Sequence, residues 1–121
     1  MTRTQKRALI VSLVEKWQVP LYLGGWAVKV YFPSRIQEIA SCRSQPEYLC
    51  ADLYFNLKRV PDTDAEIREL VCHEMLHCHV EALAQLANRG ARRTPERREA
   101  IRLAEERLVT TLSRVVLPAL P

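Results

Sequence analysis

Apolar side chains recur at helical spacing near the start of the chain. In the segment MTRTQKRALIVSLVEKW they occupy one face of an amphipathic helix. That face carries Leu9, Ile10, Leu13, Val14 and Trp17. The stretch QVPLYLGGW that follows contains a proline and two adjacent glycines, which predict a turn.

Two later segments alternate apolar and polar positions, as half-buried β-strands do. WAVKVYF is stopped by Pro33, and its apolar side carries Trp26, Val28, Val30 and Phe32. YLCADLYFNL directs Ala51, Leu53, Phe55 and Leu57 one way, and Asp52, Tyr54 and Asn56 the other. Residues 34–46 between them are ambiguous: Ile36 and Ile39 suit a helix, whereas SCRSQP is typical of a loop. A short helix and an irregular crossing are equally expected there.

Two long helices are predicted in the second half of the chain. The first begins at a capping box formed by Thr63 and Glu66, and Gly90 is its natural stop. The second is capped by Thr94 and ends at Pro118. The sequence therefore predicts a single α+β domain over residues 1–121. A short antiparallel or mixed sheet is packed by an N-terminal helix, a long motif helix and a C-terminal helix.

All three histidines lie in ELVCHEMLHCHVEAL, inside the first long helix. A helical residue turns about 100°, so His73 and His77 are one turn apart and about 40° around the axis. Imidazoles so placed can bind one metal ion, which is why H-E-x-x-H has this spacing. Glu74 lies beside them, where it can take the proton of a metal-bound water without replacing that water. His79 lies about 240° from His73 and is not expected to be a ligand. The motif predicts one Zn²⁺ ion with Glu74 as catalytic base, although iron and manganese use similar ligands.

A catalytic zinc usually has three protein ligands, so the third must come from outside the motif. The last helix has an apolar face formed by Ile101, Ala104, Leu108, Leu112 and Val115. Glu105 lies in the middle of this face, where a carboxylate needs a positive partner. Glu106 lies at its edge, beside Val109 and Ser113, and is the second candidate. The sequence does not decide whether Glu105 or Glu106 is the third ligand. Two alternatives need no metal. Glu105 or Glu106 could pair with an arginine at the rim of the helix, and His73 and His77 could be hydrogen-bonded within the core.

The segments AEIRELVCHEMLHCHV and YLCADLYFNL resemble short zincin-like metallopeptidases, many of them phage-encoded, allied to SprT-like and minimal gluzincin proteins. The resemblance implies His73 and His77 as zinc ligands, Glu74 as general base and acid, and a third ligand on a downstream helix. It also implies that the strand before the site runs along the cleft and holds a peptide or protein substrate by β-augmentation. Side chains proposed for that edge are Asp52, Tyr54 and Asn56, with a solvated face as the alternative.

The chain departs from the larger zincins in one respect. These carry a further His, Tyr or Arg that stabilises the oxyanion, and here only Tyr48 and Tyr54 offer themselves for that role.

The net charge of +4 is unevenly distributed. NRGARRTPERREAIR concentrates six arginines, Arg89, Arg92, Arg93, Arg97, Arg98 and Arg102. Such a patch can follow a phosphate backbone, and the SprT-like proteins of the resemblance act on DNA-associated proteins. No aromatic residues interleave with it to stack on bases, and a solvated turn with i, i+4 pairing is the alternative.

Composition limits the remaining classes of function. A chain of 121 residues with 48% apolar and 26% charged residues fits a globular domain. No apolar run reaches the roughly 18 residues that span a bilayer. Four cysteines without a C-x-x-C pair, and the lack of a secretion signal, predict free thiols in the cytoplasm, the host's if the protein is phage-encoded. The main hypothesis is a zinc-dependent metallopeptidase. A non-catalytic zinc module and a basic nucleic-acid or assembly adaptor are the alternatives.

Overall fold

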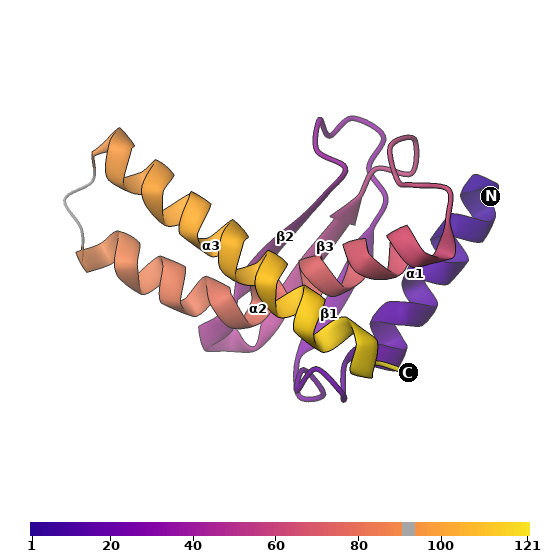
Figure 1. The fold of residues 1–121 in the computed structure, drawn as a ribbon, viewed down its shortest axis with the longest axis horizontal. Helices are drawn as coiled ribbons and strands as arrows, with labels where there is room; N and C mark the ends of the chain where they lie inside the picture. The colour runs from indigo at the N-terminus through magenta and orange to yellow at the C-terminus, as the bar shows by residue number, and fades with distance from the viewer. Residues whose placement is uncertain (91–93) are drawn as a thin grey trace.

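Helices and a small mixed sheet make up the computed structural model of the chain, which confirms the α+β class (Figure 1). The structure describes residues 1–90 and 94–121. The elements are α1 (Arg3–Trp17), β1 (Ala27–Tyr31), β2 (Ala40–Gln45), the 3-10 helix η1 (Pro46–Tyr48), β3 (Cys50–Phe55), α2 (Asp64–Gly90), α3 (Pro95–Val116) and the 3-10 helix η2 (Leu117–Ala119).

The sheet has the strand order β1-β3-β2, so β3 is the central strand. It pairs in parallel with β1 and antiparallel with β2. The alternation read from the sequence is confirmed, because Ala51, Leu53 and Phe55 of β3 are buried while the residues between them are half-buried. The expected helix or irregular crossing over residues 34–46 is wrong in its second half, where β2 forms. Its sequence ASCRSQ has only the small apolar residues Ala40 and Cys42 and no large apolar or β-branched side chain, and the strand is held by its pairing with β3 over its full length.

The core lies between the helices and one face of the sheet. The apolar face expected for α1 is confirmed, with Ile10 and Trp17 fully buried. They share one hydrophobic cluster with Leu53 of the sheet and with Val71 and Met75 of α2, all fully buried. α2 thus packs one side against the core. His73 and His77 of the H-E-x-x-H motif project from its other side.

The capping box expected at the start of α2 forms in part, since the Glu66 side chain accepts from the Thr63 hydroxyl instead of the Thr63 backbone N–H. The Glu66 backbone N–H donates to Thr63 Oγ1 at 3.3 Å, and the Thr63 hydroxyl donates to Glu66 Oε2 at 2.5 Å. The helix runs to Gly90 as expected. Thr94 caps α3 by accepting a hydrogen bond from the Arg97 backbone N–H at 3.3 Å.

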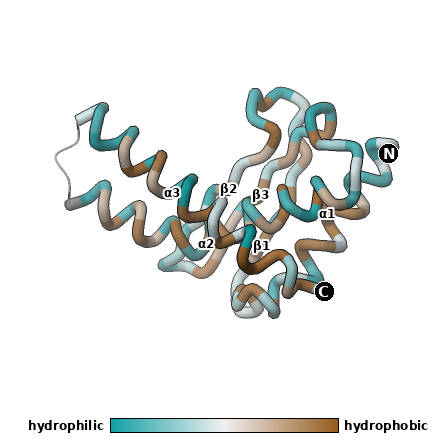
Figure 2. Tube along the Cα trace, viewed as in Figure 1, coloured by the Kyte–Doolittle hydropathy of each residue, from teal (hydrophilic) through white to brown (hydrophobic). Residues whose placement is uncertain are grey.

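α2 and α3 form a long antiparallel hairpin whose closed end projects past the sheet (Figure 1). Hydrophobic residues continue along both helices into that projecting part (Figure 2). The apolar face expected for α3 is therefore wrong in part: Leu108 is 42% and Val115 71% exposed, while Val109 and Ser113 are the buried residues. Because α3 packs chiefly on α2, only a narrow line of its residues is covered. None of the helices described is long and apolar enough to cross a membrane.

Candidate metal centre

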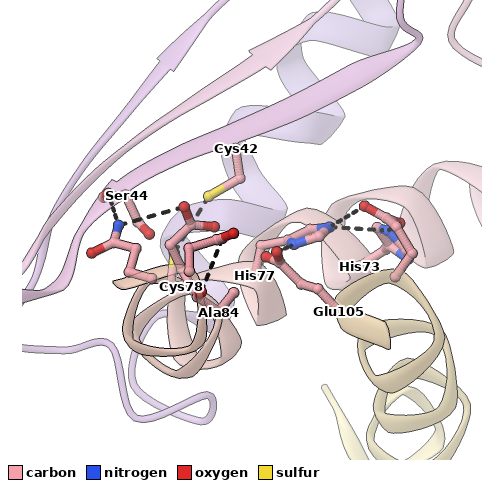
Figure 3. Close-up of polar contacts among 11 residues, drawn as sticks. Cys42, Ser44, His73, His77, Cys78, Ala84 and Glu105 are labelled. Atoms are coloured by element: carbon pink, nitrogen blue, oxygen red, sulfur yellow. Dashed lines mark hydrogen bonds and ion pairs between the residues drawn. The ribbon is translucent and has the colours of Figure 1, made fainter. Parts of the chain in front are cut away.

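Three side chains from two helices converge at one point between α2 and α3. His73 and His77 project from the outer side of α2, and their Nε2 atoms are 3.3 Å apart. Glu106 of α3 faces both rings, with Oε2 3.1 Å from His73 Nε2 and Oε1 3.2 Å from His77 Nε2. These three residues form a cluster whose ligand atoms are close enough to hold one metal ion. The i, i+4 spacing expected to bring the two histidines together does so (Figure 3).

The separations among these donor atoms fit a small tetrahedral ion. Zinc bonds to nitrogen and oxygen at about 2.0–2.1 Å, and the edge of a tetrahedron with such bonds is about 3.3 Å. The Nε2 atoms of His73 and His77 are 3.3 Å apart, close to that edge, and each lies 3.1 or 3.2 Å from a different carboxylate oxygen of Glu106. Burial, as the largest cause, and the nearby His77 lower the pKa of His73. Its ring is therefore held in the neutral form that ligates metals.

Glu105 contacts the other nitrogen of His77. Its Oε1 lies 2.9 Å from His77 Nδ1, and both side chains are largely buried (Figure 3). Because a carboxylate accepts hydrogen bonds, Nδ1 is the nitrogen that donates to Glu105, and Nε2 is the nitrogen that faces Glu106. Glu105 and Glu106, which the sequence could not tell apart as ligands, therefore contact different nitrogens of His77. Glu81 lies on the Glu105 side, with ligand atoms of His77, Glu81 and Glu105 also close together.

Glu74 is 6% exposed, and no hydrogen bond to its carboxylate is found within the described ranges 1–90 and 94–121. Burial raises the pKa of Glu74 to about 7, against the opposing effect of the neighbouring His77. A carboxyl group with this pKa both accepts and releases a proton near neutral pH.

Two cavities meet at the motif. The Glu69 cavity, of about 470 Å³, is lined by Ile39, Ala40, Pro61, Glu66, Glu69, Leu70, His73 and Glu74. The Glu81 cavity, of about 320 Å³, is lined by Glu38, Ala40, Ser41, Cys42, His73, Glu74, His77, Glu81, Glu105 and Glu106. His73 and Glu74 line both, so the cluster is open to solvent on two sides. The wall opposite α2 is formed by β2 and by Glu38 and Ile39, which precede it. Sequence reasoning missed this wall because residues 34–46 carry no strand pattern.

Several other expectations can be placed in the fold. His79 is away from the cluster, as expected, and its Nε2 donates to the Leu21 carbonyl at 2.6 Å. The cleft edge expected from β3 is wrong, because β3 is paired on both sides and β2 is the outer strand. Asn56 is buried and donates to the Ile36 carbonyl at 2.9 Å. Tyr54 stacks on Tyr31 at 5.3 Å between ring centroids, and neither it nor the exposed Tyr48 lines the two cavities.

The described arginines of the basic segment lie near the end of α2 and the start of α3. Arg89 is in the last turn of α2, and Arg89, Arg98 and Arg102 line a third cavity, of about 420 Å³, which Glu105 lines as well. Arg102 is paired through two hydrogen bonds with Glu99, at 2.7 and 2.9 Å. Arg92 and Arg93 lie outside the described residues.

Comparisons of the chain with protein-family models, with curated proteins and with solved structures gave no match.

Proposed function

We propose that this protein is a zinc-dependent metallopeptidase of the zincin-like kind, a hydrolase of peptide bonds. The observation that carries the proposal is the convergence of His73, His77 and Glu106, whose ligand atoms are close enough to hold one ion, with Glu74 lining the same cavity. His73, His77 and Glu106 would hold one Zn²⁺. Glu105 would fix the orientation and tautomer of His77 through Nδ1.

The residues divide the chemistry between them. A zinc ion held here would lower the pKa of its bound water to about 7 and polarise the carbonyl of the scissile bond. Glu74 takes up the proton of the attacking water and passes it to the nitrogen of the leaving amine. Its pKa of about 7 suits both transfers, because the best general base and acid has a pKa close to the working pH. The surrounding protein supplies this property by burying the carboxyl group.

The outer strand β2 suits an extended substrate. Ala40, Ser41 and Cys42 line the Glu81 cavity, and β2 has a strand partner on one side only within the described part of the chain. An extended peptide can pair with the free edge of such a strand, which would lay its backbone across the motif.

Glu74 also favours catalysis over a purely structural zinc site. A structural site closes all four positions of the ion with protein ligands and has no use for a nearby base. Here the ligand set offers three residues, and two cavities adjoin it. The nucleic-acid contact expected from Arg89, Arg97 and Arg98 stays a prediction, which salt-dependent DNA binding would test.

The test is a titration of activity against zinc. The purified protein is stripped with a chelator, its hydrolysis of an unfolded protein is measured, and Zn²⁺ is returned in steps. We expect activity to be lost with the metal and to return in proportion to zinc, up to one ion per chain. Hydrolysis that continues without metal, or tight zinc binding with no hydrolysis, would refute the proposal.

A further inference from the structure

The walls of the two cavities carry acidic side chains in a protein that is basic overall. Seven of the fourteen acidic residues of the chain line them, and no lysine or arginine does so among the residues that the structure describes. The net charge of the chain is nevertheless +4. Separation of charge of this kind attracts a ligand of opposite sign to the cleft.

The Glu69 cavity has a second property that selects among positive ligands. Ile39, Leu70 and Pro61 give it an apolar wall, and Ile39 is 43% exposed. Lysine and arginine carry an apolar stem that packs on such a wall while the charged end stays in water. The cavity thus combines the two surfaces that these side chains contact.

One carboxylate in this cavity is free to receive the charged end. Glu66 is engaged in the capping box with Thr63. Glu69, one turn further along α2, is exposed, and no hydrogen bond or ion pair to its side chain is found within residues 1–90 and 94–121. Glu74 is the third acidic residue of the Glu69 cavity and is 6% exposed, with no hydrogen bond to its carboxylate among residues 1–90 and 94–121. Because it also lines the Glu81 cavity, it lies between the Glu69 cavity and the two histidines.

We infer that the cleft selects extended peptides with a lysine or arginine beside the scissile bond, the side chain of which lies in the Glu69 cavity against Leu70 and pairs with Glu69. This inference rests on the proposed peptidase function and names its substrate class. Glu38 and Glu81, in the neighbouring cavity, extend the same preference to basic residues further along the peptide.

The test measures binding without turnover, using the zinc-loaded Glu74→Gln variant. Four extended peptides differ only at the central residue, which is arginine, lysine, norleucine or glutamate. Norleucine keeps the apolar stem without the charge. We expect the arginine and lysine peptides to bind about 10-fold more tightly than the glutamate peptide at low salt, with norleucine between them, and added salt to reduce the difference.

Glu69→Gln, made in the same background, supplies the sharper comparison. It should weaken the arginine peptide about 3- to 5-fold and leave the norleucine peptide unchanged, since only the ion pair is removed. Glu15→Gln is the matched control, because Glu15 is an exposed acid on α1 that lines neither cavity, and it should change neither peptide. Equal binding of all four peptides, no binding of any, or equal effects of Glu69→Gln and Glu15→Gln would overturn the inference.

The two proposals fail in different ways. If the zinc-loaded wild-type protein cleaves none of the peptides while the Glu74→Gln variant still binds the basic ones selectively, the peptidase proposal fails and the selectivity stands. If the wild-type protein cleaves all four with equal kcat/KM, the peptidase stands and the selectivity fails.

Discussion

Replacing Glu106 and Glu105 one at a time should separate a metal ligand from a residue that positions a ligand. Glu106 places its two carboxylate oxygens 3.1 and 3.2 Å from the Nε2 atoms of His73 and His77. Glu105 contacts the other ring nitrogen of His77, Nδ1, at 2.9 Å. Replacing Glu106 removes a ligand of the ion. Replacing Glu105 leaves the three proposed ligands, His73, His77 and Glu106, in place.

The expected magnitudes follow from this difference. Four-ligand zinc sites bind with about 10–16 kcal/mol, or roughly 2.5–4 kcal/mol per ligand, so Glu106→Gln should weaken zinc binding about 10²- to 10³-fold. Glu105→Ala should weaken it about 10- to 100-fold, the usual effect of removing the hydrogen-bond partner of a ligating histidine. Glu105→Gln should lose less, because the glutamine oxygen can still accept from Nδ1.

Competition with a chromogenic chelator measures these affinities at fixed pH. Glu99→Gln is the matched control on the same helix, because Glu99 is exposed, is paired with Arg102 and lines neither motif cavity. It should bind zinc like the wild type. A larger loss in Glu105→Gln than in Glu106→Gln would refute the assignment of the two roles.

Three further predictions concern stability. The Lys6 ammonium lies 2.7 Å from Asp62 and lowers the pKa of that carboxyl below its ordinary value of 3.8. The ion pair therefore stabilises the fold at neutral pH, and this stability is lost as the pH falls through the lowered pKa. The difference in unfolding midpoint between wild type and Asp62→Asn should therefore be seen at pH 7 and vanish in acid well below 3.8; a difference independent of pH would contradict this. Val109→Ala should lower the free energy of unfolding by about 2–3 kcal/mol in denaturant titrations, because Val109 is fully buried. Leu108→Ala, at a 42% exposed position, should cost less than about 1 kcal/mol, and equal costs would contradict the packing of α3. Tyr22 has φ 59° and is 88% exposed, so Tyr22→Gly should raise the midpoint by relieving about 1 kcal/mol of strain, and a lower midpoint would count against this backbone conformation.

The helix that carries the motif could be predicted from the sequence because its signals are local. The capping box of Thr63 and Glu66, the stop at Gly90 and the i, i+4 spacing of His73 and His77 all act within one element. The three fix where α2 begins, where it ends and which way the two rings point.

β2 could not be predicted because its cause is not local. Ala40–Gln45 consists of small and polar residues without a large apolar or β-branched side chain, and it becomes a strand through its pairing with β3. The same pairing makes β2 the outer strand beside the cluster, and this moves the expected substrate edge away from β3.

The roles of Glu105 and Glu106 depend on the rotation of α3 about its axis. Neighbouring residues point about 100° apart on a helix, so a rotation of about that size exchanges the two. Burial of Val109 and Ser113 against α2 sets that rotation and turns Glu106 toward both Nε2 atoms. The apolar stripe through Leu108 and Val115 suggested a different rotation, because both residues are apolar although they are 42% and 71% exposed.

The most direct test of the account compares hydrolysis by wild type and Glu74→Gln at equal zinc occupancy. Rates are measured on an unfolded protein substrate, with bound zinc determined by elemental analysis of the same samples. We expect one zinc per chain in both proteins and a rate at least 10²-fold lower in the variant, on the order of the contribution of general base catalysis, since the residue that moves the proton is lost while the three ligands remain. Equal rates at equal zinc content would contradict the role of Glu74, and with it the central claim that this cluster is a peptidase active site.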